Sequence, residues 1–214
     1  MANNVSYDEE HKVAADDEQP AGRGAGELSS RRSQIVTAAR ELLESGGNDA
    51  VTMRAIANKL GIQAPSLYKH FPDKAALEAA LVAATFVELA DAFSQVARRS
   101  RHPLAALGRA YRGWATSHPH LYLLMTNRPL ERERLPEGVE AAAAAPIVKA
   151  CGGDPDRARA AWAFAHGMTS LELANRFPPG ADLDAAWRSG LDALQQSTTT
   201  PNEGAHDEDP RTHH

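Results

Sequence analysis

Apolar residues recur every three to four positions along most of this chain, which is the spacing of one buried face of an α-helix. From Met53 to Leu60 they occupy the first, fourth, fifth and eighth positions, and the run from Arg31 to Glu44 repeats this spacing. No stretch shows the strict alternation of a half-buried β-strand. The pattern therefore predicts an all-α protein of about nine helices.

Two of the predicted helices are joined by a tight turn. Thr52 can cap the helix Met53 to Leu60, and Gly61 follows where a left-handed backbone favours glycine. Pro65 falls in the first turn of the next short helix, and Pro72 ends that helix. This layout is typical of a helix-turn-helix, whose second helix enters the major groove of DNA. An αα-corner with a solvated polar face would have the same layout.

A long helix is expected next, capped by Asp73 and apolar on more than one side, so that it should pack between neighbours. Lys74 would make its first turn an anion site suited to a DNA phosphate. Pro146 should kink or divide the alanine-rich helix, and the charged loop 131–138 is a candidate mobile lid or edge. The later helices are expected at 103–117, 119–126, 137–151, 154–177 and 182–196.

The composition divides the chain into four parts. Residues 1–28 carry seven acidic residues and the glycine-rich AGRGAG, so they should form a disordered arm. Residues 29–76 should form the helix-turn-helix domain, with Ser29 or Ser30 capping its first helix. Residues 77–196 should form a second helical domain, and the polar, acidic residues 197–214 a disordered tail.

Charge is distributed unevenly along the 214 residues. The formal net charge is −5, so the whole molecule is no polycation. Between Arg31 and Lys74, however, seven basic residues stand against four acidic ones. A basic segment in an otherwise acidic chain favours a nucleic-acid-binding end.

Several classes of protein are disfavoured by the sequence. The lone Cys151 excludes a disulfide framework and is expected to be a buried, inert thiol. No apolar run approaches the roughly 20 residues of a membrane helix, so we expect no membrane partner and a cytoplasmic location. No nucleophile motif, phosphate loop or zinc-protease motif is present, so we expect neither an enzyme nor a cofactor. The histidine pairs 118/120 and 213/214 lack further ligands, and no metal site is expected.

Residues 33–77, SQIVTAARELLESGGNDAVTMRAIANKLGIQAPSLYKHFPDKAAL, resemble the N-terminal domain of the TetR family of bacterial transcriptional repressors. The glycine pair, Thr52, Leu60–Gly61 and the LYKHF-x-x-K run fall in register with that family. The later AWAFAHGMTSLEL is similar to a C-terminal subtype of the family with a Trp…His-Gly (WHG) motif, here Trp162, His166 and Gly167.

The resemblance implies a bacterial, nucleoid-associated homodimer in which residues 77–196 form the regulatory and dimerisation domain. The dimer would repress a promoter by binding a palindromic operator. It would release the operator when a small hydrophobic or amphipathic inducer binds. It also implies that Thr52, Tyr68 and Lys74 contact phosphates, while the outer face of the second helix meets bases. The full set of expected DNA contacts is Thr52, Arg54, Gln63, Ala64, Pro65, Ser66, Tyr68, Lys69, His70 and Lys74.

Dimerisation would use the last two helices, whose small and branched residues permit close four-helix packing. These residues are Ala158, Ala161, Ala165, Leu171, Leu173, Leu183, Leu191 and Leu194.

A set of large side chains in the regulatory part is expected to form an apolar pocket with a few polar anchors. The same side chains could equally fill the core, and His166 could be a structural hydrogen-bonding residue rather than a ligand anchor. Glu172 is expected to make an interface or core hydrogen bond. The candidate pocket residues are Phe86, Tyr111, Trp114, Leu121, Tyr122, Met125, Trp162 and His166.

Two other functions fit the sequence less well. One is a helical small-molecule-binding or catalytic bundle that no longer reads DNA. The other is a DNA-binding adaptor controlled by a protein partner through its acidic tails. The polar face between Gln63 and Lys74 favours the ligand-responsive regulator.

Overall fold

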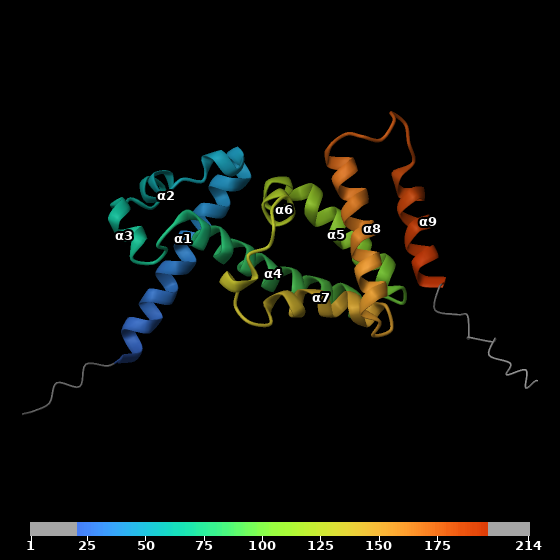
Figure 1. The fold of residues 1–214 in the computed structure, drawn as a ribbon, viewed down its shortest axis with the longest axis horizontal. Helices are drawn as coiled ribbons and strands as arrows, with labels where there is room; N and C mark the ends of the chain where they lie inside the picture. The colour runs from blue at the N-terminus through green and yellow to red at the C-terminus, as the bar shows by residue number, and fades with distance from the viewer. Residues whose placement is uncertain (1–20, 197–214) are drawn as a thin grey trace, which may run out of the picture.

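A computed structural model describes residues 21–196 of the chain, and these residues form an elongated arrangement of helices with no strand among them (Figure 1). The expected all-α fold is confirmed. The described residues hold nine α-helices and one short 3₁₀ helix: α1 Ala21–Ala50, α2 Met53–Leu60, α3 Ala64–Tyr68, α4 Lys74–Arg99, α5 Pro103–Ser117, α6 Pro119–Thr126, η1 Arg132–Arg134, α7 Val139–Ala150, α8 Pro155–Leu173 and α9 Leu183–Gln196.

The helix-turn-helix is formed by α2 and α3, held against α1. The hydroxyl of Thr52 accepts a hydrogen bond from the Ala55 amide (3.1 Å), as expected for an N-cap. Gly61 has a φ of 65°, the left-handed conformation that ends a helix. At the start of α4, Asp73 accepts from the Ala76 amide at 2.6 Å. These local signals were all readable from the sequence.

The first helix begins earlier than the sequence suggested. It starts at Ala21, so residues 21–28 are helical and the expected disordered arm is wrong for them; residues 1–20 of that arm lie outside the described residues. Ser29 is inside the helix rather than at its cap, and its carbonyl accepts from the Ser33 hydroxyl (3.1 Å). Once core packing has fixed one turn, each added residue costs little, so a helix extends past the last buried side chain. Its regular part ends at Gly47, which has non-helical angles (φ 70°, ψ −171°).

Two helices, α3 and α7, differ from expectation, and in each the packing of a single residue is the reason. The helical bonds of α3 stop at Tyr68, and the chain then turns so that Phe71 reaches the core. In contrast, α7 continues through Pro146 undivided. Pro146 is buried where α7 packs along α4, and this burial offsets the backbone hydrogen bond that proline cannot donate.

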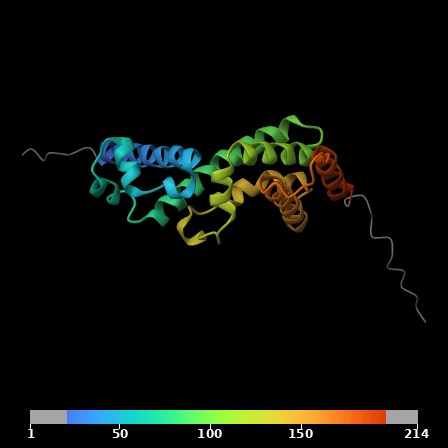
Figure 2. The same cartoon turned by 90° about the horizontal axis from the view of Figure 1, so that it is seen from above.

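The regulatory half is a layer of α4 and α7 covered by α5 and α8, with α9 at the end farthest from α3 (Figures 1 and 2). Its core gathers around Trp187 and Leu191 of α9, and the Trp187 ring meets the Phe164 ring edge-on at 5.6 Å. Arg112 joins three helices: it donates to both oxygens of Glu172 on α8 (2.8 Å each) and to Asp184 on α9 (2.6 Å). The expected hydrogen bond of Glu172 is therefore found, within the chain. No helix of the described residues is long and apolar enough to cross a membrane.

The packing of α8 on α9 corrects one part of the expected dimer interface. Ala158, Ala161, Ala165 and Leu191 are all buried within this single chain, at 1–5% exposure, so they form its own core and cannot meet a second subunit. Helical periodicity identified an apolar face but could not say which neighbour covers it. Leu171 is different, being 45% exposed.

We expect Gly190→Ala to lower the free energy of unfolding by about 1–3 kcal/mol, since added volume in a packed core is destabilising. A Cβ at this position would lie 2.2 Å from the Phe164 ring and would push that ring from Trp187. Chemical denaturation measures the effect. Gly113→Ala is the matched control: nothing lies within 4 Å of a Cβ there, so alanine should be neutral or stabilise the helix. Equal stability of the two variants would contradict this account of the α8–α9 packing.

Candidate nucleic-acid interface and regulatory cluster

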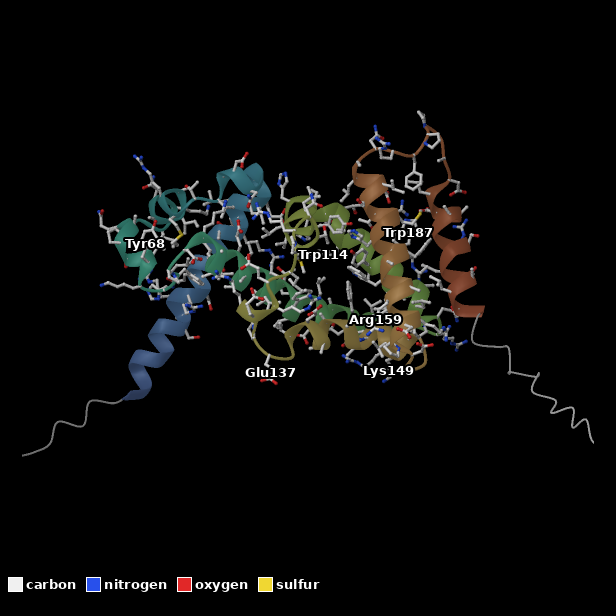
Figure 3. All side chains as sticks on the ribbon, in the orientation of Figure 1. Tyr68, Trp114, Glu137, Lys149, Arg159 and Trp187 are labelled. Carbon is white, nitrogen blue, oxygen red and sulfur yellow. The ribbon has the colours of Figure 1, made fainter. Side chains whose placement is uncertain are left out.

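The expected DNA-contact surface is the outer side of α3, which rests on two buried anchors. Leu67 and Phe71 are 0% and 1% exposed, and they fix the helix on the core. On the opposite side, Gln63, Pro65, Tyr68 and Lys69 are exposed, with Tyr68 at 52%. Figure 3 shows Tyr68 at one end of the molecule and Trp187 near the other.

The other expected DNA contacts differ in their exposure and in the hydrogen bonds that they already make within the chain. Arg54 is exposed on α2, whereas Ala64, Ser66 and His70 are partly buried. Thr52 is exposed, but its hydroxyl already caps α2. Lys74 is partly buried and donates to the carbonyl of Asn48 (3.1 Å).

Arg32 of α1 holds the end of α3 in place. Its guanidinium lies 4.3 Å over the centre of the Phe71 ring and donates to the His70 carbonyl. A cation over an aromatic face stabilises both partners. Arg32 therefore has a structural role, fixing the turn that follows α3 against α1.

A chain of four aromatic side chains connects α5, α6 and α8 in the regulatory half. The Tyr122 hydroxyl lies 2.8 Å from Nδ1 of His166. The Trp162 ring stacks on the His166 ring, with the ring centroids 5.6 Å apart and an interplanar angle of 15°. Tyr111 meets Tyr122 edge-on, with ring centroids 6.3 Å apart. Trp162 is 51% exposed, so the cluster reaches the surface at one end and is buried at the other. We call Tyr111, Tyr122, Trp162 and His166 the aromatic cluster.

The buried end of the aromatic cluster favours neutral phenols. Burial raises the pKa of Tyr111 above its ordinary value, and the neighbouring Tyr122 adds to this effect. Burial likewise raises the pKa of Tyr122. Both hydroxyls therefore stay protonated well above neutral pH, and the Tyr122 hydroxyl can donate to the His166 carbonyl, 3.2 Å away.

The remaining candidate pocket residues do not join this cluster. Leu121 is fully buried in the core that α6 shares with the helix-turn-helix, and Trp114 packs against the same core. For Leu121 the pocket assignment is thus corrected to a core role, because its face of α6 turns toward α1. Phe86 and Met125 are partly buried on α4 and α6.

The N-terminal end of α6 is joined to α1 by two histidines. Nδ1 of His118 lies 3.2 Å from a carboxylate oxygen of Glu44, and Nδ1 of His120 lies 3.2 Å from the Glu44 carbonyl. Among the described residues, no group of three or more His, Cys, Asp and Glu could hold a metal ion. His213 and His214 lie outside those residues. In the structure, His118 and His120 therefore connect α6 to α1.

Cys151 and the charged loop also have defined surroundings. Cys151 is buried, and burial raises the pKa of its thiol, which disfavours the reactive thiolate. In the loop expected to be a lid, Arg132 donates to Glu140 of α7 (2.7 and 2.8 Å) and Arg134 pairs with Glu131 (2.5 Å). The loop's charges are thus largely paired with acids nearby.

Comparison with known proteins matches both halves of the chain. Residues 35–81 match the family described as "Bacterial regulatory proteins, tetR family", and residues 104–194 match "Tetracyclin repressor-like, C-terminal domain". An uncharacterised HTH-type transcriptional regulator of Mycobacterium tuberculosis is 32% identical over 153 residues, which is 66% of this chain and 70% of that protein. This chain belongs to the TetR family of transcriptional regulators.

Solved structures agree with the TetR-family fold. The crystal structure of a regulatory protein is 28% identical, with a TM-score of 0.66 over 83% of this chain and 100% of that chain. A TetR variant from Acinetobacter baumannii, solved in complex with minocycline, is 26% identical, with a TM-score of 0.54 over 76% of this chain and 93% of that chain. The WHG subtype is not among these matches and stays a prediction.

Several contacts between the two halves of this TetR-family chain could not be predicted from the sequence. Arg128 contacts Glu78, which is 50 residues away, and His118 contacts Glu44, which is 74 residues away. No motif links such distant positions in a single sequence. The only available signal was the density of charge after α6.

We expect the stability of the protein to fall as pH rises above about 10, where tyrosines of the unfolded chain ionise while Tyr111 stays protonated in the fold. In Tyr111→Phe this contribution is absent. Between about pH 9 and about pH 11 the variant should lose about 1 kcal/mol less stability than the wild type. Urea denaturation at the two pH values measures this difference. Equal losses would show that Tyr111 ionises freely in the folded protein.

Proposed function

We propose that this chain is a ligand-released repressor that binds a palindromic operator as a homodimer. The observation that carries the proposal is the exposed polar face of α3, fixed on Leu67 and Phe71, in a chain of the TetR family. The alternatives that abandon DNA binding do not explain it.

The proposed DNA contacts divide by position on the domain. Gln63 and Pro65 stand at the N-terminal end of α3, the end that reaches base edges in helix-turn-helix complexes. A glutamine bonds adenine with two hydrogen bonds, and a proline contacts a thymine methyl group. Tyr68, Lys69 and Lys74 supply a hydroxyl and two cations for phosphate oxygens.

The proposed dimer is built on the outward side of α8, at the end of the molecule opposite α3 (Figure 1). Ala160, Ala163 and Leu171 are exposed and Gly167 partly so, and their spacing puts them on one face. Small residues allow two copies of a helix to approach closely. A two-fold pair would present two recognition helices to half-sites roughly 34–36 Å apart.

The proposed ligand site is the aromatic cluster. It combines stacking surface on Trp162 with hydroxyl and imidazole groups that can orient a ligand. A similar protein was solved in complex with minocycline, which supports a ring-containing ligand for this chain. Tyr122 lies on α6, so a ligand held there would act on the helix that adjoins the DNA-binding domain.

Tyr68→Ala combined with Lys74→Ala should weaken binding to the operator at least about 100-fold, since two phosphate contacts are lost. The slope of log affinity against log salt should fall by about 1, because one cation is removed. Fluorescence anisotropy of a labelled duplex, selected by the wild-type protein from a random library, measures both.

Lys149→Ala is the matched control, since it removes an equivalent exposed charge from α7, far from Tyr68 (Figure 3). It should bind like the wild type. If the double variant also binds like the wild type at fixed salt, the assigned recognition surface is wrong. Sedimentation of both variants should show an unchanged dimer.

A compound that releases the operator should bind the free protein more tightly than the DNA-bound protein, by the same factor that it weakens DNA binding. Titration calorimetry with and without saturating operator duplex tests this equality. A releasing compound that binds both forms equally would rule out release through a shifted conformational equilibrium.

A further inference from the structure

Four side chains from three separate segments meet beside the first turn of α4. The Lys74 ammonium donates to the Asn48 carbonyl (3.1 Å) and lies 3.5 Å from Oε1 of Glu78. Arg128, just after α6, contacts Oε2 of Glu78 at 3.1 Å. The Asn48 amide, turned to satisfy its neighbours, donates to Oε1 of Glu78 (3.0 Å) and accepts from Arg128 (3.0 Å). We call these four residues the α4 junction.

Glu78 is the shared acceptor of the α4 junction, and its side chain is only 15% exposed. Its two oxygens are taken at hydrogen-bond distance by Arg128 and Asn48. Lys74 stands slightly farther away, at 3.5 Å, and its side chain remains 38% exposed. An ammonium has three donors, so Lys74 keeps at least one for an oxygen outside the protein.

The cations around Glu78 determine whether the Lys74 ammonium is available to a phosphate. With Arg128 present, the negative charge of Glu78 is compensated by a partner that carries no proposed DNA contact. Without Arg128, Lys74 would be the nearest cation to a partly buried carboxylate, and the carboxylate would compete with a phosphate for it.

We propose that Arg128 is a positioning residue for DNA binding: by holding Glu78, it leaves Lys74 available to a phosphate of the duplex. The inference rests on the proposed DNA contact of Lys74 and adds to it a residue of the regulatory half. Arg128 follows directly after Asn127, the C-cap of α6, the helix that carries Tyr122. The end of α6 thereby adjusts the strength of a phosphate contact made by α4.

Operator affinity of matched variants tests the proposal, with the duplex selected by the wild-type protein as the probe and salt held constant. Arg128→Gln should bind the operator about fivefold more weakly than the wild type. This factor corresponds to the free energy of a partly exposed ion pair, here Lys74 with Glu78. Arg132→Gln is the control: the same loop loses the same charge, but Arg132 pairs with Glu140 rather than with α4. It should bind like the wild type. Thermal unfolding followed by circular dichroism checks that each variant is folded.

Two double variants separate positioning from a direct contact. Glu78→Gln added to Arg128→Gln should restore affinity, because the carboxylate that competes for Lys74 is gone. In a Lys74→Ala background, Arg128→Gln should have no further effect, since Arg128 acts through Lys74. Arg128→Gln should lower the salt slope only where Lys74 is present, and in the Lys74→Ala background it should leave the slope unchanged, because Arg128 acts on the phosphate contact of Lys74.

Three results would overturn the inference. The first is an Arg128→Gln affinity equal to that of Arg132→Gln. The second is an undiminished loss in the Lys74→Ala background with a salt slope lower by about 1, which would make Arg128 itself a phosphate contact. The third is a wild-type protein that enriches no duplex, in which case the proposed function fails and the inference fails with it.

Discussion

The helix-turn-helix of this chain depends on a core that it does not complete by itself. Ile35, Leu43, Ile56, Leu67 and Phe71 come from α1, α2, α3 and the turn after it, yet the same cluster includes residues of α4 and α6. The added residues are Leu77, Leu81 and Leu121, each at most 2% exposed. Burial of apolar surface is the main term that stabilises a fold, so the DNA-binding half takes part of its stability from the regulatory half. The two halves named from the sequence are thus one packing unit at their junction.

This shared core gives a physical basis for communication between the halves. At one end of α6, His118 and His120 contact Glu44 of α1, and at the other end Arg128 contacts Glu78 of α4. Between these ends, Leu121 enters the core while Tyr122 turns to the aromatic cluster. A well-packed interior transmits strain rather than absorbing it. A displacement of α6 must therefore be accompanied by a movement of α1 and α4.

The sequence predicted what is encoded by neighbouring residues. The caps at Thr52 and Asp73 and the left-handed Gly61 follow from residues within a few positions of the groups they serve. The family's motif likewise lies in one continuous segment. Where the outcome depended on a partner far along the chain, the predictions were incomplete or wrong: the alanines of α8 were assigned to a second subunit, and Leu121 to a pocket. A periodic pattern shows that a face is covered but carries no information on what covers it.

The three tryptophans occupy three different environments, and this gives the molecule built-in optical probes. Trp187 is buried under Arg112, Trp162 is half in water on His166, and Trp114 adjoins His118 at the domain junction. Indole emission shifts with the polarity around the ring. Versions of the protein that keep one indole at a time would therefore report separately on the far end of the bundle, on the candidate binding cluster and on the junction between the halves, without any added label.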